Sequence, residues 1–108
     1  MDSVVGMATE VRDQPDHSRY EILVDGVVAG FAQYRRGDDR ITVMHTEVDD
    51  AYEGQGLGSE LVRHVLEEAR AAGLAVLPSC PFTASWIKRH PEYLDLVPEG
   101  ARPAYDLA

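Results

Sequence analysis

In the first half of the chain, hydrophobic and polar residues alternate as they do in β-strands. This alternation predicts strands at residues 20–24 and 27–34. Asp25-Gly26 between them is the signal of a tight two-residue hairpin, because that turn requires positive φ. A second polar turn, at residues 35–39, leads into a further predicted strand at residues 40–48.

The second half of the chain changes to helical spacing. Residues 57–72 predict a helix with one apolar stripe, formed by Leu57, Leu61, Val62, Val65, Leu66 and Ala69. Gly73 is a natural stop for this helix. The continuous apolar run at residues 74–77 is typical of a strand buried on both faces. Residues 82–90 predict a second, shorter helix, which Pro91 ends.

A strand, a crossover helix and a strand of these lengths imply a parallel pair. The predicted fold class is therefore α/β (α+β), with a mixed sheet: an antiparallel N-terminal meander and a parallel βαβ unit. With 108 residues the chain forms one domain around one core. We place that domain at residues 8–97, with a short first strand at 8–12 and a loop at 14–18. Residues 1–7 are expected to be a loose end and residues 98–108 a tail with little pattern.

Three glycines at alternate positions lie between the predicted strand and the first helix. Gly54, Gly56 and Gly58 allow the backbone to approach a ligand closely, and the helix adds unpaired N–H groups and a positive dipole end. This combination predicts an anion site, most often a phosphate site. Ser59-Glu60 after the last glycine excludes a P-loop, which needs Lys and Ser/Thr there. The alternative is a tight strand-to-helix turn, for which one glycine would be enough.

Charge and composition narrow the possible partners. The net charge of −9 argues against nucleic acid and favours a cationic partner. No apolar run approaches the ~20 residues of a membrane span, and the N-terminus lacks the pattern of a secretory signal. The single cysteine fits a reducing cytoplasm, where we expect this protein. No pair of His or Cys residues has metal-ligand spacing, so no metal is expected.

Three side chains are candidates for chemistry. Cys80 precedes the second helix, where a thiolate is stabilised; the alternative is a small buried hydrophobe. His45, predicted to share a strand face with Val43 and Glu47, could take a proton from an attacking amine or could be structural. Glu47 is the competing base, acting through a bound water.

Four blocks of residues carry a family resemblance. They are His45–Val48, Gly54–Gly58, Pro78–Phe82 and His90–Tyr93, in this order. The chain resembles the GCN5-related N-acetyltransferases over roughly residues 8–97, and within them the short single-domain YjdJ-like or NATD1-like branch. The glycine block is similar to the acyl-CoA loop of that superfamily.

The resemblance implies where acetyl-CoA binds. It implies a splay between the two central strands, into which the pantetheine arm inserts. Glu53 stands where Arg or Gln is usual in the loop, so the resemblance does not imply a charge contact from that side chain. Lys88 could reach a CoA phosphate or could belong to an exposed basic face. The implied cofactor-binding residues are Thr46, Val48, Gly54, Gln55, Gly56, Leu57, Gly58, Ser59 and Lys88.

The resemblance also implies the reaction. It points to an acetyl-CoA-dependent N-acetyltransferase that moves an acetyl group to a primary amine of a protein lysine, a polyamine or a small amine. His45 or Glu47 would be the base, and Cys80 would accept the acetyl group or donate a proton to the departing thiolate. The alternative is a non-catalytic acyl-CoA-binding or interaction module. We expect a monomer or a weak dimer, with an amine substrate and neither a nucleic-acid nor a membrane partner.

Overall fold

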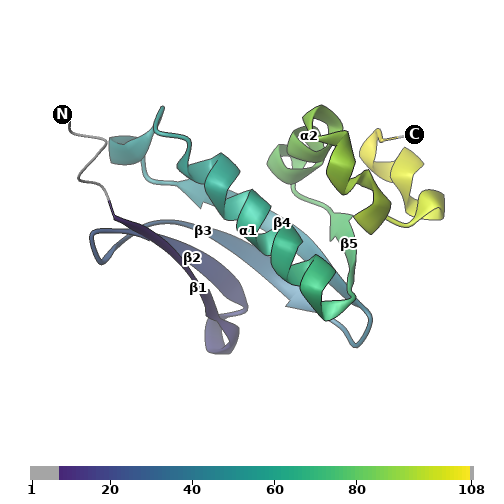
Figure 1. The fold of residues 1–108 in the computed structure, drawn as a ribbon, viewed down its shortest axis with the longest axis horizontal. Coiled ribbons are helices and arrows are strands. Elements are labelled where there is room, and N and C mark those ends of the chain that lie inside the picture. Colours follow the sequence, from purple (N-terminus) through teal and green to yellow (C-terminus); the bar gives the residue numbers. More distant parts are fainter. Residues whose placement is uncertain (1–7, 108) are drawn as a thin grey trace.

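The computed structural model describes residues 8–107, whose strands form one five-stranded sheet in the order β1-β2-β3-β4-β5 (Figure 1). All neighbouring strands are antiparallel except β4 and β5, which are parallel. This topology confirms the predicted mixed sheet. The elements are β1 (Thr9–Gln14), β2 (Arg19–Val24), β3 (Val27–Arg36), β4 (Arg40–Val48), α1 (Leu57–Ala72), β5 (Ala75–Pro78) and α2 (Pro81–Arg89).

The hairpin between β2 and β3 forms as predicted. Asp25 and Gly26 have φ of 49° and 84°, which are the left-handed values that the tight turn requires. β1 ends two residues later than predicted, and the loop after it contains one 3-10 turn, η2 (Pro15–His17). The N-terminal end expected to be loose, residues 1–7, lies outside the described residues.

Helix α1 has the predicted bounds, and all its stripe residues are buried. They pack against β2, β3, β4 and β5, so that α1 crosses one face of the sheet (Figure 1). Burial of a Leu or Val side chain contributes about 1.5–3 kcal/mol, which makes this stripe a main source of stability. Gly73 ends the helix with φ of 70°, and its N–H donates to the carbonyls of Ala69 and Arg70.

Strand β5 begins and ends one residue later than predicted, and helix α2 begins and ends one residue earlier. The prediction that the strand is buried on both faces is wrong: Val76 and Pro78 are buried, whereas Ala75 and Leu77 are half-buried. The physical reason is that Val76 points into the core against α1 and α2, whereas Ala75 and Leu77 point to the other face of the sheet.

The residues after α2 form two 3-10 helices, η4 (Pro91–Leu96) and η5 (Glu99–Tyr105). The last segment, expected to carry little pattern, therefore has regular structure. Tyr105 and Leu107 pack against the core, and the Arg102 guanidinium donates to the carbonyls of Leu94 and Val97.

A β-bulge interrupts β4 in the middle of the strand. Gln33 of β3 lies opposite His45, but the next residue, Tyr34, lies opposite Val43. Met44 is therefore the extra residue without a partner on β3.

The bulge reverses the alternation of the side chains that follow it. Val43 is buried in the core, and Thr46 lies on the same side, with its hydroxyl 3.5 Å from that of Thr83 in α2. His45 and Glu47 are exposed on the other face. The prediction that His45 shares a face with Val43 is therefore wrong, whereas its pairing with Glu47 is correct.

Strands β4 and β5 part after a short paired stretch. Their last pair is Val43 and Pro78, and the backbone N–H of Cys80 then donates to the Val43 carbonyl at 2.9 Å. β4 continues to Val48. Residues 44–48 thus have no strand beside them on the β5 side, which is the splay that the resemblance implies.

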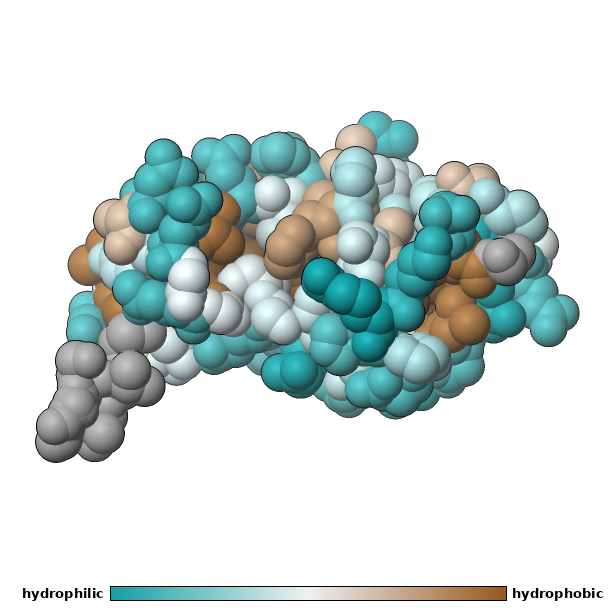
Figure 2. Space-filling model, turned by 90° about the horizontal axis from the view of Figure 1, so that it is seen from above, coloured by the Kyte–Doolittle hydropathy of each residue, from teal (hydrophilic) through white to brown (hydrophobic). Residues whose placement is uncertain are grey.

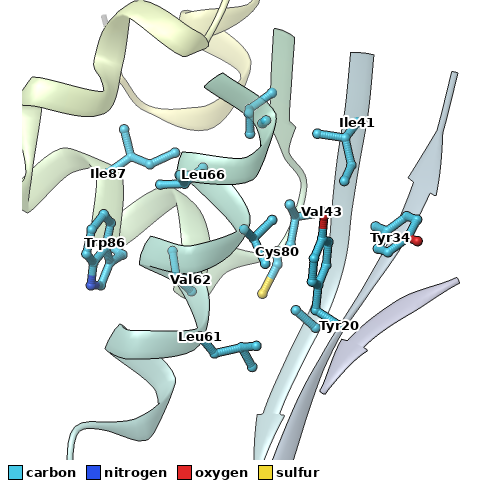
Figure 3. Close-up of a cluster of buried hydrophobic side chains, with 14 of the residues drawn as sticks. Tyr20, Tyr34, Ile41, Val43, Leu61, Val62, Leu66, Cys80, Trp86 and Ile87 are labelled. Atoms are coloured by element: carbon cyan, nitrogen blue, oxygen red, sulfur yellow. The ribbon is translucent and has the colours of Figure 1, made fainter. Parts of the chain in front are cut away.

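The core lies between the sheet and the helices. In Figure 3 the Cys80 side chain lies among the labelled core residues, in the space between helix α1 and strand β4. The surface in Figure 2 is largely hydrophilic, with separate hydrophobic areas. No helix within residues 8–107 combines the length and hydropathy that a membrane span needs.

Two buried phenols should make the fold sensitive to alkaline pH. Burial, together with nearby Asp13 and Glu68, raises the pKa of Tyr20 to about 12. Burial and the hydrogen bond from its hydroxyl to Asp13 (2.7 Å) also raise the pKa of Tyr34. In the unfolded chain a tyrosine phenol has a pKa of about 10, and below this pH the neutral phenols contribute their full stability to the fold. This contribution is lost as the pH rises through the higher pKa values of the two phenols in the folded protein.

We therefore expect the free energy of unfolding, measured with urea, to fall between pH 10 and pH 12. Tyr34→Phe should lower it by about 1 kcal/mol at pH 7, because one hydrogen bond is lost, and should make the alkaline fall smaller. An alkaline fall of the same size in both proteins would contradict the role of Tyr34.

Candidate functional site

A cavity of about 350 Å³ lies where the free part of β4 meets the glycine turn and the start of α1. This volume is within the range of small-molecule sites. Three parts of the chain form its wall: the end of β4, the segment from η3 (Asp50–Tyr52) into α1, and the start of α2. The lining residues are Thr46, Val48, Tyr52, Glu53, Gly54, Gly56, Leu57, Gly58, Ser59 and Phe82.

The three glycines have two different roles. Gly54 and Gly56 have φ of 82° and 77°, a conformation that residues with a Cβ rarely adopt. Gly58 lies in the first turn of α1, where a Cβ would come within 3.0 Å of the Phe82 ring. Its lack of a side chain therefore keeps the cavity open between α1 and α2.

The N-terminus of α1 faces this cavity with its donors free. Gly56 is the N-cap residue, and no side chain caps the helix. The N–H groups of Leu57, Gly58 and Ser59 therefore lack partners within the helix and lie at the positive end of its dipole. This arrangement is suited to an anion, and most of all to a phosphate group.

Thr46 and Val48 form the strand side of the cavity. Both are half-buried and belong to the part of β4 that no strand flanks on the β5 side. Unpaired backbone groups on a strand edge can bind an extended ligand that carries amide groups.

Cys80 lies beneath this wall and does not line the cavity. It is the N-cap residue of α2 and is only 3% exposed. Burial acts to raise the pKa of the Cys80 thiol, but hydrogen bonds from the Thr83 backbone, the Thr46 and Thr83 hydroxyls and the Phe82 backbone outweigh it. The net result is a lowered pKa. Thr46 thus connects the thiol to the cavity, because it contacts both.

His45 and Glu47 lie together on the opposite face of β4. The Nε2 atom of His45 is 3.1 Å from Oε1 of Glu47, and the two side chains are 56% and 62% exposed. The His45 ring also lies 6.0 Å from the Phe31 ring. The carboxylate only accepts hydrogen bonds, so in this pair Nε2 carries the proton and Nδ1 of a neutral His45 is free to accept one.

The structure brings together most of the residues predicted to bind the cofactor. Those that line the cavity are Thr46, Val48, Gly54, Gly56, Leu57, Gly58 and Ser59. Gln55 is exposed in the turn and does not line it. Lys88 lies elsewhere, with Nζ 2.9 Å from Asp106. Lys88 follows Phe82 by six residues, which is more than one and a half helical turns, so the two side chains lie on different sides of α2. Lys88 therefore faces the end of η5 and not the cavity.

Sequence reasoning missed two aromatic residues of the cavity. Tyr52 lies in η3 before the glycines, and Phe82, at the start of α2, is 42% exposed. Phe82 directly follows Cys80-Pro81 in one of the four motif blocks. This position could have identified it as a residue of the site. Among residues 8–107, no group of three or more His, Cys, Asp or Glu side chains is placed to hold a metal ion.

Comparisons with curated proteins and with solved structures give different results. A search of curated proteins finds no match. Among solved structures, the chain is similar to the crystal structure of a Trypanosoma brucei acetyltransferase, with 21% identity and a TM-score of 0.46. That match covers 70% of this chain and 63% of the other, so the chain spans less than two thirds of that protein.

One family model matches most of the chain. Residues 19–96 match the model described as GCN5-related N-acetyl-transferase. The matched range begins with β2 and ends in η4, and it includes the whole cavity with Cys80, His45 and Glu47. The chain therefore belongs to the GCN5-related N-acetyltransferase family.

Proposed function

We propose that this chain is an acetyl-CoA-dependent N-acetyltransferase of the short single-domain branch. Its acceptor is a primary amine of a protein lysine, a polyamine or a small molecule. The observation that carries the proposal is one cavity that joins a free strand edge, unpaired helix N–H groups and a neighbouring thiol of lowered pKa. Family membership supports acetyl-CoA as the acetyl donor.

Acetyl-CoA binds in two parts of this cavity. The N–H groups of Leu57, Gly58 and Ser59 hold the pyrophosphate, because they point at an anion without needing a side chain. The edge of β4 at Thr46–Val48 binds the amides of the pantetheine arm as a neighbouring strand would. Lys88 lies outside this cavity, with Nζ 2.9 Å from Asp106, and we assign it no contact with the pyrophosphate.

The acceptor amine approaches from the face of β4 that carries His45 and Glu47. Residues 44–48 of β4 have a free edge, and groups on both faces of the strand can approach a ligand bound at that edge. The His45–Glu47 pair and the thioester of acetyl-CoA therefore meet there. Glu47 holds the imidazole through Nε2, and Nδ1 takes the proton from the attacking amine. The C–N bond then forms while the C–S bond to CoA breaks.

Cys80 supplies the proton for the departing thiolate through the Thr46 hydroxyl, which contacts the thiol and lines the cavity. The lowered pKa of Cys80 makes it a stronger acid than an ordinary cysteine. After the products leave, the His45 imidazolium releases its proton to solvent and the Cys80 thiolate takes one up, which restores both groups and closes the proton balance. A non-catalytic acyl-CoA-binding module, the other function considered from the sequence, would bind acetyl-CoA without this chemistry.

Acetyl-CoA is expected to stabilise the protein against heat. At about 100 times its dissociation constant, the ligand adds ~2.7 kcal/mol, which raises Tm by roughly 10 °C or more in a domain of this size. Gly58→Ala should weaken binding about tenfold or more, because the added methyl crowds Phe82 at the cavity. Differential scanning fluorimetry with and without acetyl-CoA measures both effects.

Gly37→Ala is the matched control, since its Cβ would meet only Arg40 at ordinary contact distance. Its Tm shift with acetyl-CoA should equal that of the wild type. A wild type that shows no shift at millimolar acetyl-CoA would exclude the proposed function.

The base is tested by release of the CoA thiol in the presence of an amine acceptor. His45→Ala should lower kcat by about 100-fold, as expected for the loss of a general base, and should leave acetyl-CoA affinity unchanged. Glu47→Gln should lower kcat less, because the amide oxygen of the new side chain still accepts a hydrogen bond from the His45 imidazole. Gln33→Ala, opposite His45 on β3, is the control with normal turnover. If only Glu47→Gln abolishes turnover, the base is Glu47.

The acid role of Cys80 predicts a specific pH profile. A proton donor works only below its pKa, so kcat should fall as the pH rises through a value lower than that of an ordinary thiol. Cys80→Ala should fold, bind acetyl-CoA, lose about 10- to 1000-fold in kcat and lack this alkaline fall. Full activity with the same pH profile would assign Cys80 to packing alone.

Intact-mass measurement during turnover distinguishes the two roles considered for Cys80. Covalent transfer through the thiol would give a species about 42 Da heavier that is absent from Cys80→Ala. We expect no such species, because direct attack by the amine leaves Cys80 as proton donor only.

A further inference from the structure

The indole of Trp86 makes a polar contact that core packing alone does not require. Trp86 lies on α2, is only 1% exposed and is the single tryptophan of the chain. Its Nε1–H donates to the hydroxyl oxygen of Ser59 at 2.6 Å. Ser59 belongs to the first turn of α1 and lines the cavity. The contact therefore connects a buried side chain of α2 with the proposed phosphate end of the site.

Contacts around the ring hold the direction of this N–H group. The His90 ring stacks on the indole with centroids 3.8 Å apart and planes 15° apart, and His90 Nδ1 lies 2.8 Å from the Trp86 carbonyl. The Arg63 guanidinium lies 5.5 Å from the centre of the indole, and the Tyr93 ring lies 5.3 Å away. The indole has little freedom to turn, so its N–H stays directed at Ser59.

Hydrogen-bond chemistry determines what this contact does to Ser59. An indole N–H only donates, so the Ser59 oxygen must accept from it. The hydroxyl proton of Ser59 then has to point away from Trp86. Because Ser59 lines the cavity, that proton is available to an acceptor oxygen of a ligand bound there.

We infer that Trp86 is a positioning residue for the donor substrate. It orients the Ser59 hydroxyl as a hydrogen-bond donor to a pyrophosphate oxygen of CoA, next to the N–H groups of the first turn of α1. This inference rests on the proposed function, since it needs CoA in the cavity. It assigns Trp86 an effect on CoA affinity and none on the proton transfers of His45 and Cys80.

Calorimetric titration of CoA, dephospho-CoA and pantetheine tests the inference. Trp86→Phe removes the N–H and keeps most of the ring. It should weaken binding of CoA and of dephospho-CoA about 3- to 10-fold, the size of one hydrogen bond, and leave pantetheine unchanged, because pantetheine lacks the pyrophosphate. Ser59→Ala should weaken the same two ligands. The double variant should be no weaker than Ser59→Ala, because the two residues act through one contact.

Tyr93→Phe is the matched control. It keeps the ring that contacts the indole and the bond from Trp86 to Ser59, and it removes only the hydrogen bond from the Tyr93 hydroxyl to Glu67 of α1. Its affinities for all three ligands should equal those of the wild type. In turnover assays, Trp86→Phe should raise KM for acetyl-CoA and leave kcat within twofold of the wild type, an expectation that follows from a pure binding effect.

A second measurement uses the folded wild type alone. The single indole N–H resonance in an NMR spectrum belongs to Trp86. It should shift on addition of CoA, because the Ser59 hydroxyl then donates to phosphate and accepts more strongly from the indole, and should stay in place with pantetheine. This measurement decides the inference even if Trp86→Phe does not fold.

The outcomes separate the inference from the proposed function. Wild-type protein that does not bind CoA overturns both. If the wild type binds CoA normally, two results with Trp86→Phe overturn the inference alone: an unchanged CoA affinity, or an equal loss of affinity for CoA and pantetheine. Either result leaves Trp86 as a packing residue. An indole resonance that does not respond to CoA also overturns it.

Discussion

The parting of β4 and β5 after Val43 is the constraint on which the rest of the site depends. Pro78 lacks the N–H that would continue the ladder, and the N–H of Cys80 satisfies the Val43 carbonyl as the chain turns into α2. A longer β5 would cover the free edge of β4 and fill the cavity with a strand. The shortness of one edge strand thus creates a place for a ligand and puts a thiol next to it.

The Met44 bulge complements this parting. Without it, strict alternation would put His45 on the same face as Val43, toward the core. The extra residue turns His45 and Glu47 to the open face and keeps Thr46 toward the cavity and Cys80. The two faces of one strand therefore carry different chemistry: an exposed imidazole–carboxylate pair on one and a buried thiol with its hydroxyl partners on the other.

The electrostatics of the site are local. The chain carries a net charge of −9, and Glu53 adds a carboxylate to the cavity wall, although the proposed donor substrate is itself an anion. The attraction must therefore come from groups in direct contact, the N–H groups of the first turn of α1 and the Ser59 hydroxyl, since screening weakens the more distant charges. The same acidic balance is consistent with the cationic amine that we propose as acceptor.

The sequence by itself determined the elements whose signals are local. The stripe from Leu57 to Ala69, the Asp25-Gly26 hairpin and the βαβ order depend on periodicity and turn chemistry, which neighbouring residues decide. The glycine motif also predicted the part of the cavity wall between Gly54 and Ser59, and the family resemblance added Thr46 and Val48. Only the tertiary structure decided the Met44 bulge, the place of Lys88 beside Asp106, the contribution of Phe82 to the cavity and the bond from Trp86 to Ser59. Each of these depends on how α2 and the neighbouring strands pack, and such contacts between residues far apart in the chain leave no periodic signal in the sequence.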